Sequence, residues 1–165
     1  MSATTGHSLD SSISSILADG VQRMVYEAGL GYLAAGMIAV GVEFLGACVD
    51  RHAFNVDWQS RKRFQKGINE FMSKVNPKYR AYNRKNSRYC LYKQLRCGMA
   101  HVVRPHGKVA FVGRGDAQKD GLKHLEVYAP LDKLVIVVED FCDDFISACA
   151  DLRKRLPSLR KKKLR

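Results

Sequence analysis

The fold is decided by one apolar stretch, residues 29–49, which reads GLGYLAAGMIAVGVEFLGACV. A single charged residue, Glu43, interrupts it, which leaves fewer than the roughly 20 uncharged residues that a membrane span needs. A carboxylate at the centre of an inserted helix also costs about 2.5–3.5 kcal/mol. We therefore predict a central helix over residues 31–50, apolar on every side and covered all round within a soluble helical bundle.

Small residues recur along this stretch, most regularly the glycines Gly31, Gly36, Gly41 and Gly46. Each glycine weakens an isolated helix by up to about 1 kcal/mol relative to alanine. Packing must therefore hold the helix together. Because glycine carries no side chain, we expect neighbouring helices to approach closely at these positions.

Helical periodicity recurs on both sides of the apolar stretch. The predicted helices cover residues 9–28, 64–75, 87–103 and 139–156. Asn76-Pro77 ends the third helix of the chain and Pro157 ends the last one, because proline lacks the N–H that a helix interior requires. The chain is thus predicted to be mainly α, a helical bundle of four to five helices.

The hydrophobic pattern changes from helical to strand-like before the last helix. Residues 108–112 and 122–128 are predicted strands, joined as a hairpin by the glycine- and aspartate-rich loop GRGDAQKDG at 113–121. Residues 134–138 are either a third short strand or the start of the last helix. The bundle therefore carries a small β-hairpin or sheet insertion over about 108–138.

The length of 165 residues and the 46% content of apolar residues are those of one compact domain with a real core. We place this single domain at residues 8–156. The basic tail, 157–165, is predicted to be disordered.

The positive charge is concentrated in two segments. The whole chain has a net charge of +12, and residues 51–96 alone carry thirteen basic residues against Asp57 and Glu70. The tail segment 153–165 adds eight basic residues and no acid. This distribution favours a polyanionic partner that binds one face of the domain.

The five cysteines indicate reduced, mostly buried thiols. Cys90 and Cys97, like Cys142 and Cys149, are spaced to lie on one helical face roughly 10 Å apart. That separation is too long for a disulfide or a shared zinc ion. The chain also begins without the pattern of a secretion signal, so we expect a cytoplasmic protein with no membrane association.

The most informative motif is LRCGMAH, residues 95–101, in which Arg96 precedes His101 by five positions. Arginine can hold a phosphate through two parallel hydrogen bonds, and histidine exchanges a proton near neutral pH. Together they could cleave RNA without a metal. An ideal helix would separate the two side chains by about 140°, so a shared site requires distortion near Gly98, bridging by the long arginine side chain, or a second subunit.

At this motif the sequence resembles the HEPN superfamily (higher eukaryotes and prokaryotes nucleotide-binding domains), whose signature is Arg, four to six residues, then His. The segments VEFLG (42–46), LYKQLRCGMAH (91–101) and VEDF (138–141) resemble uncharacterised bacterial members. The resemblance implies a homodimeric, metal-independent endoribonuclease. In it Arg96 binds the phosphate and His101 is the general acid and base, at a site shared across the dimer.

Two further interpretations stay open. Cys97 follows Arg96, where active members often carry Asn, Asp or His, and this favours a non-catalytic module that binds RNA or a regulatory, toxin–antitoxin-like protein partner. The third interpretation is an unrelated helical adaptor with a basic tail. For RNA, the predicted guiding and stacking residues lie in one polar loop: Tyr79, Arg80, Tyr82, Arg84, Lys85 and Arg88.

We expect neither a metal nor a cofactor, because the sequence has no zinc, P-loop or nucleophile-elbow motif. Glu139, Asp140, Asp143 and Asp144 cluster where the last helix begins, and acids are favoured at a helix N-terminus without any metal. Four histidines are predicted to be isolated surface or loop residues: His7, His52, His106 and His124.

Overall fold

The apolar stretch forms one helix, α3 (Gly31–Val49), in a computed structural model that describes residues 8–159. Ala35, Ile38 and Val42 are fully buried and face the centre of the bundle. By length and composition alone α3 could cross a membrane, yet 56% of its most apolar window is buried inside the protein. The prediction of a central helix is confirmed.

One face of α3 is exposed, so the prediction that the helix is covered all round is wrong. Leu33, Met37 and Val40 are 47%, 40% and 46% exposed. Their spacing of four and three residues aligns them along the helix, and we call them the α3 stripe. The apolar pattern alone cannot distinguish a face that the same chain covers from one that it leaves open.

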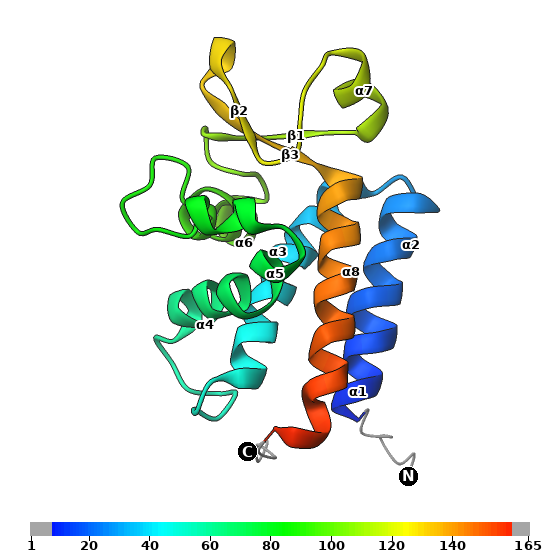
Figure 1. Ribbon diagram of the computed structural model, residues 1–165, viewed down its shortest axis with the longest axis vertical. Helices are drawn as coiled ribbons and strands as arrows, with labels where there is room; N and C mark the ends of the chain where they lie inside the picture. The colour runs from blue at the N-terminus through cyan, green and yellow to red at the C-terminus, as the bar shows by residue number, and fades with distance from the viewer. Residues whose placement is uncertain (1–7, 160–165) are drawn as a thin grey trace.

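The other helices pack around α3, and several consist of joined segments (Figure 1). The N-terminal helix comprises α1 (Leu9–Ser11), the π-helical η1 (Ser12–Asp19) and α2 (Gly20–Tyr26). The next comprises α4 (Ser60–Gly67), η2 (Ile68–Met72) and α5 (Ser73–Val75), followed by the 3-10 helix η3 (Pro77–Tyr82). The last two are η4 (Tyr92–Cys97) with α6 (Gly98–Val102), and α8 (Val138–Arg155) with the final turn η6 (Leu156–Ser158).

A three-stranded sheet lies at one end of the bundle, above the start of α8 (Figure 1). Its elements are β1 (Val109–Val112), α7 (Arg114–Lys119), β2 (Glu126–Tyr128), the turn η5 (Ala129–Leu131) and β3 (Lys133–Val137). The strand order is β1-β3-β2, with β3 parallel to β1 and antiparallel to β2. The protein is therefore mainly helical with a small sheet before the last helix, as predicted.

The topology of this sheet differs from the predicted hairpin. The connection at 113–121 contains α7 instead of a hairpin loop, because β1 pairs in parallel with β3 and needs a crossover connection. The hairpin is formed by β2 and β3. Residues 133–137 are a strand that continues directly into α8, which resolves the alternative that the sequence left open.

The backbones of α3 and α4 approach closely at two glycines. A Cβ atom on Gly46 would lie 1.8 Å from the carbonyl oxygen of Arg63, and one on Gly67 would lie 2.0 Å from that of Val42. No real Cβ atom occupies such a position. The expectation that glycines of the apolar stretch allow close helix contacts is thus confirmed at Gly46.

The thiols are free, and all but that of Cys97 are buried. Burial is the main cause that raises the pKa of Cys142 to about 11 and that of Cys149 to about 12. The prediction of mostly buried thiols is confirmed. Of the tail that was predicted to be disordered, Pro157 and Ser158 belong to η6, and residues 160–165 lie outside the described residues.

Candidate functional site

Arg96 is held in place by Glu43, the only charged residue of α3. The Nε atom of Arg96 donates to Oε2 of Glu43 at 2.7 Å, and the two side chains are 19% and 18% exposed. Arg96 comes from η4 and Glu43 from α3, so the ion pair joins two helices of the bundle. It fixes the direction of the guanidinium group.

Two hydroxyl groups extend this contact into a chain. Ser60 Oγ donates to the same oxygen of Glu43 at 2.8 Å. Because that bond uses the single hydrogen of the serine, the Tyr92 hydroxyl, 3.1 Å away, donates to Ser60 Oγ. We call Glu43, Ser60, Tyr92 and Arg96 the Arg96 cluster. The guanidinium of Arg61 lies 5.7 Å from the centre of the Tyr92 ring and brings a second positive charge to it.

The Arg96 cluster has the chemistry of a phosphate site. Among the contacts described for residues 8–159, Arg96 uses only its Nε atom. Its two terminal nitrogens are thereby left for an anion, and two parallel N–H donors match the oxygens of a phosphate. Glu43 keeps the fork oriented before any ligand binds.

His101 does not join this cluster within one copy of the chain. It is exposed on α6, and no hydrogen bond or ion pair between it and Arg96 is found in the described part of the chain. The helix is indeed distorted, but the π-helical turn ends at Cys97, before most of the interval between the two residues. Gly98–Val102 are α-helical, so we still expect the two side chains to lie about 140° apart around the helix axis.

The chain turns back sharply after His101. Val103 has a φ of 54°, a left-handed conformation that is rare for a β-branched residue. The N–H of His106 then donates to the carbonyl of Gln94 at 2.7 Å, and a Cβ on Gly98 would lie only 2.5 Å from the carbonyl oxygen of Arg104. The turn is therefore packed against the helix that carries Arg96 and His101.

The basic residues of the polar loop are exposed, as a nucleic-acid surface requires. Arg80, Arg84 and Lys85 lie on the surface. Arg88 is exposed as well, but it forms an ion pair with Asp132 at the turn before β3. Three of the four predicted cations of this loop are thus presented to solvent without a described partner.

The two tyrosines of the loop point inward, so the prediction that they stack on bases is wrong for Tyr79 and unsupported for Tyr82. Tyr79 is fully buried. Tyr82 is half-buried, with its hydroxyl donating to the carbonyl of Leu125 at 3.2 Å and its ring edge-on to Tyr89. Both rings pack in or against the hydrophobic core next to η3. A tyrosine with charged neighbours in the sequence can bury its apolar ring when its hydroxyl finds a hydrogen-bond partner.

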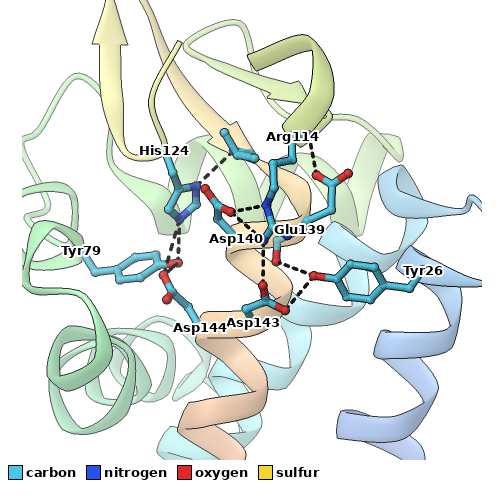
Figure 2. A network of polar contacts seen from close by, with 9 residues as sticks. Tyr26, Tyr79, Arg114, His124, Glu139, Asp140, Asp143 and Asp144 are labelled. Carbon is cyan, nitrogen blue, oxygen red and sulfur yellow. Dashed lines mark hydrogen bonds and ion pairs between the residues drawn. The ribbon is translucent and has the colours of Figure 1, made fainter. Parts of the chain in front are cut away.

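The acids at the start of α8 bind Arg114 (Figure 2). Arg114 donates through Nε to Asp140 at 2.8 Å and through Nη2 to Asp143 at 2.7 Å, while its backbone N–H donates to Glu139. Tyr26 of α2 donates to Asp143 at 2.7 Å, and burial followed by this bond raises the pKa of Tyr26 to about 12. These contacts fasten α7 and α2 to the start of α8.

His124 is not an isolated surface histidine, which corrects that prediction. Its side chain is 7% exposed, and Nδ1 accepts from the backbone N–H of Val137 at 3.0 Å. The proton of the neutral ring is therefore on Nε2, which donates to the Tyr79 hydroxyl at 3.1 Å, and Tyr79 donates to Asp144 at 3.0 Å (Figure 2). These three hydrogen bonds join η3, the sheet and α8. Burial, and then Asp144, raise the pKa of Tyr79 well above its usual value.

Within residues 8–159, no group of three or more His, Cys, Asp or Glu side chains is arranged to hold a metal ion. The acids of α8 serve instead as partners of Arg114 and Tyr79.

Comparison of the chain with known protein families, with curated proteins and with solved structures finds no match. The resemblance to the HEPN superfamily thus stays a prediction based on Arg96, His101 and the segments around them. The geometry of the Arg96 cluster is the observation that bears most directly on function.

Proposed function

We propose that this protein is a HEPN-like RNA-binding module that holds a backbone phosphate at the Arg96 cluster. The observation that carries this proposal is the ion pair with Glu43, which occupies Nε of Arg96 and leaves the terminal nitrogens oriented for an anion. Arg61, next to the Tyr92 ring, adds a second positive charge at the same place. The exposed cations of the polar loop extend the attraction to a longer polyanion.

Binding of labelled single-stranded RNA by fluorescence anisotropy tests the proposal. Arg96→Ala is expected to weaken binding about tenfold or more, because a charge-assisted hydrogen bond to phosphate is lost. The slope of log affinity against log salt concentration should also fall by about one. Arg153→Ala on α8 is the matched control: it removes the same charge from a residue paired with Asp10. Equal effects of the two substitutions would contradict a specific role for Arg96.

Metal-independent cleavage of RNA is the second candidate function, and it requires two copies of the chain. The α3 stripe (Leu33, Met37 and Val40) is an apolar surface of the kind that a second copy covers. Gly36, on the same helix, packs against Met99 of α6, so His101 is carried by a helix next to the stripe. In a homodimer joined there, we propose that His101 of one copy completes the site around Arg96 of the other.

Cleavage is tested with labelled RNA in the presence of EDTA. The wild-type dimer is expected to cut, and His101→Ala should slow cutting by about a hundredfold, the contribution of a general acid or base. Circular dichroism and sedimentation should stay unchanged, because His101 is exposed. Met37→Asp should yield a monomer that does not cut. If the wild type binds RNA without cutting it, the nuclease function is rejected and the RNA-binding function is retained.

A further inference from the structure

The only tryptophan of the chain is almost completely exposed. Trp58 is 97% exposed and lies in the loop between α3 and α4. Its φ is 62°, a left-handed backbone conformation that a bulky residue rarely adopts. Large aromatic rings normally contribute to cores or interfaces, and uncommon backbone conformations persist where the surrounding structure enforces them, often at functional sites.

Hydrogen bonds and an aromatic contact attach the loop that carries Trp58 to α4 and α3. Arg63 is 6% exposed and donates to Asp50 at 2.6 Å, to the carbonyl of Phe54 at 2.8 Å and to that of Ala53 at 2.5 Å. The Phe54 ring stacks on Phe44 of α3, with the ring centres 5.7 Å apart and the planes 12° from parallel. These contacts anchor the first half of the loop, and the exposed indole lies four residues after Phe54.

Trp58 lies close in the chain to basic residues and to a member of the Arg96 cluster. Ser60, two residues later, is a member of that cluster. Two residues span at most about 7 Å of chain, so the indole is attached close to the proposed phosphate site. Arg61 and Lys62 follow Ser60 and supply the positive charge near Trp58, whereas residues 52–59 contain Asp57 and no Lys or Arg.

We infer that Trp58 stacks on a base of single-stranded RNA whose phosphate is held by Arg96. This inference rests on the proposed RNA-binding function and names its substrate class, because only an unpaired strand can offer a free base face to the indole. Single-strand binding sites combine positive charges, which attract the phosphate backbone, with exposed aromatic rings, on which the bases stack. Trp58 thus takes the role that sequence patterning assigned to Tyr79 and Tyr82.

Intrinsic fluorescence tests the inference directly, since all tryptophan emission comes from Trp58. Titration with a single-stranded RNA oligonucleotide should quench this emission, with the same midpoint as RNA anisotropy. A duplex of the same sequence should quench it much less. Trp58→Leu should weaken single-strand binding by about tenfold to a hundredfold, the usual effect of removing one stacked base. Leu131→Ala is the control, an exposed apolar residue at the sheet, and should leave affinity unchanged.

The outcomes separate the inference from the function on which it rests. RNA binding that depends on Arg96, without quenching and without an effect of Trp58→Leu, would overturn the stacking role alone. Absence of RNA binding by anisotropy would overturn both proposals. Quenching by vesicles of anionic phospholipid but not by RNA would assign Trp58 to a membrane surface and overturn the inference.

Discussion

Replacement of Gly46 by alanine is expected to lower the free energy of unfolding by about 3 kcal/mol or more. The added Cβ would lie 1.8 Å from the carbonyl oxygen of Arg63 and 2.8 Å from the backbone nitrogen of Gly67. Overpacking usually costs about 1–3 kcal/mol when side chains can move aside. Here the obstacles are backbone atoms of α4, so the two helices must separate and their shared core must open.

Urea denaturation of the wild type and the variant measures this loss. Gly115→Ala is the matched control: Gly115 lies in α7, and a Cβ there would meet no atom within 4 Å. The free energy of unfolding of this control variant should be unchanged, or higher by up to about 1 kcal/mol because alanine favours a helix more than glycine does. Gly67→Ala should repeat the effect of Gly46→Ala, because its Cβ would lie 2.0 Å from the carbonyl oxygen of Val42. A loss below about 1 kcal/mol at both glycines would contradict direct backbone contact between α3 and α4.

The sequence predicted well those features that depend on neighbouring residues. The apolar stretch forms α3, Gly29 with φ 65° precedes its start, and Asn76-Pro77 marks the end of α5. Each of these signals acts through local backbone conformation or through the period of apolar residues. They identify an element without knowledge of its neighbours.

Features that depend on distant residues were predicted less well. The glycine- and aspartate-rich connection at 113–121 favours a loop by composition, but α7 forms there and Arg114 is bound by Asp140 and Asp143. Those partners lie more than twenty residues away. The parallel pairing of β1 with β3 is likewise a long-range contact that no local pattern encodes. Tertiary contacts override local propensity in both cases.

In the candidate site, too, local sequence patterns predicted some residues, and contacts between distant residues determine the rest. The Arg–His spacing drew attention to Arg96, yet Glu43, which orients it, lies 53 residues away. A carboxylate inside an otherwise apolar helix was the signal for that contact, because a half-buried charge requires a partner. Nothing in the sequence distinguishes the buried Tyr79 from the exposed Trp58, since both lie in polar surroundings along the chain.

Replacement of Arg63 by methionine is expected to destabilise the protein by about 3–5 kcal/mol, the usual cost of removing one partner of a buried ion pair. Arg63 counts among the thirteen basic residues of 51–96, but it is 6% exposed and binds Asp50 and the carbonyls of Ala53 and Phe54. Methionine fills similar space and supplies none of these donors. The half-buried acceptors then lose their bonds to the guanidinium.

Thermal and urea unfolding measure this cost, and the emission of Trp58 adds a local readout. Lys62→Met is the control, since Lys62 is an exposed neighbour on the same helix, and it should change stability by less than about 0.5 kcal/mol. Arg63→Lys keeps the charge but lacks the planar fork, so we expect a loss between those of the two methionine variants. In Arg63→Met the loop loses its anchors, so the fluorescence anisotropy of Trp58 should fall even where the bundle remains folded. If anisotropy and RNA affinity stay at wild-type values, Arg63 does not hold the loop that carries Trp58.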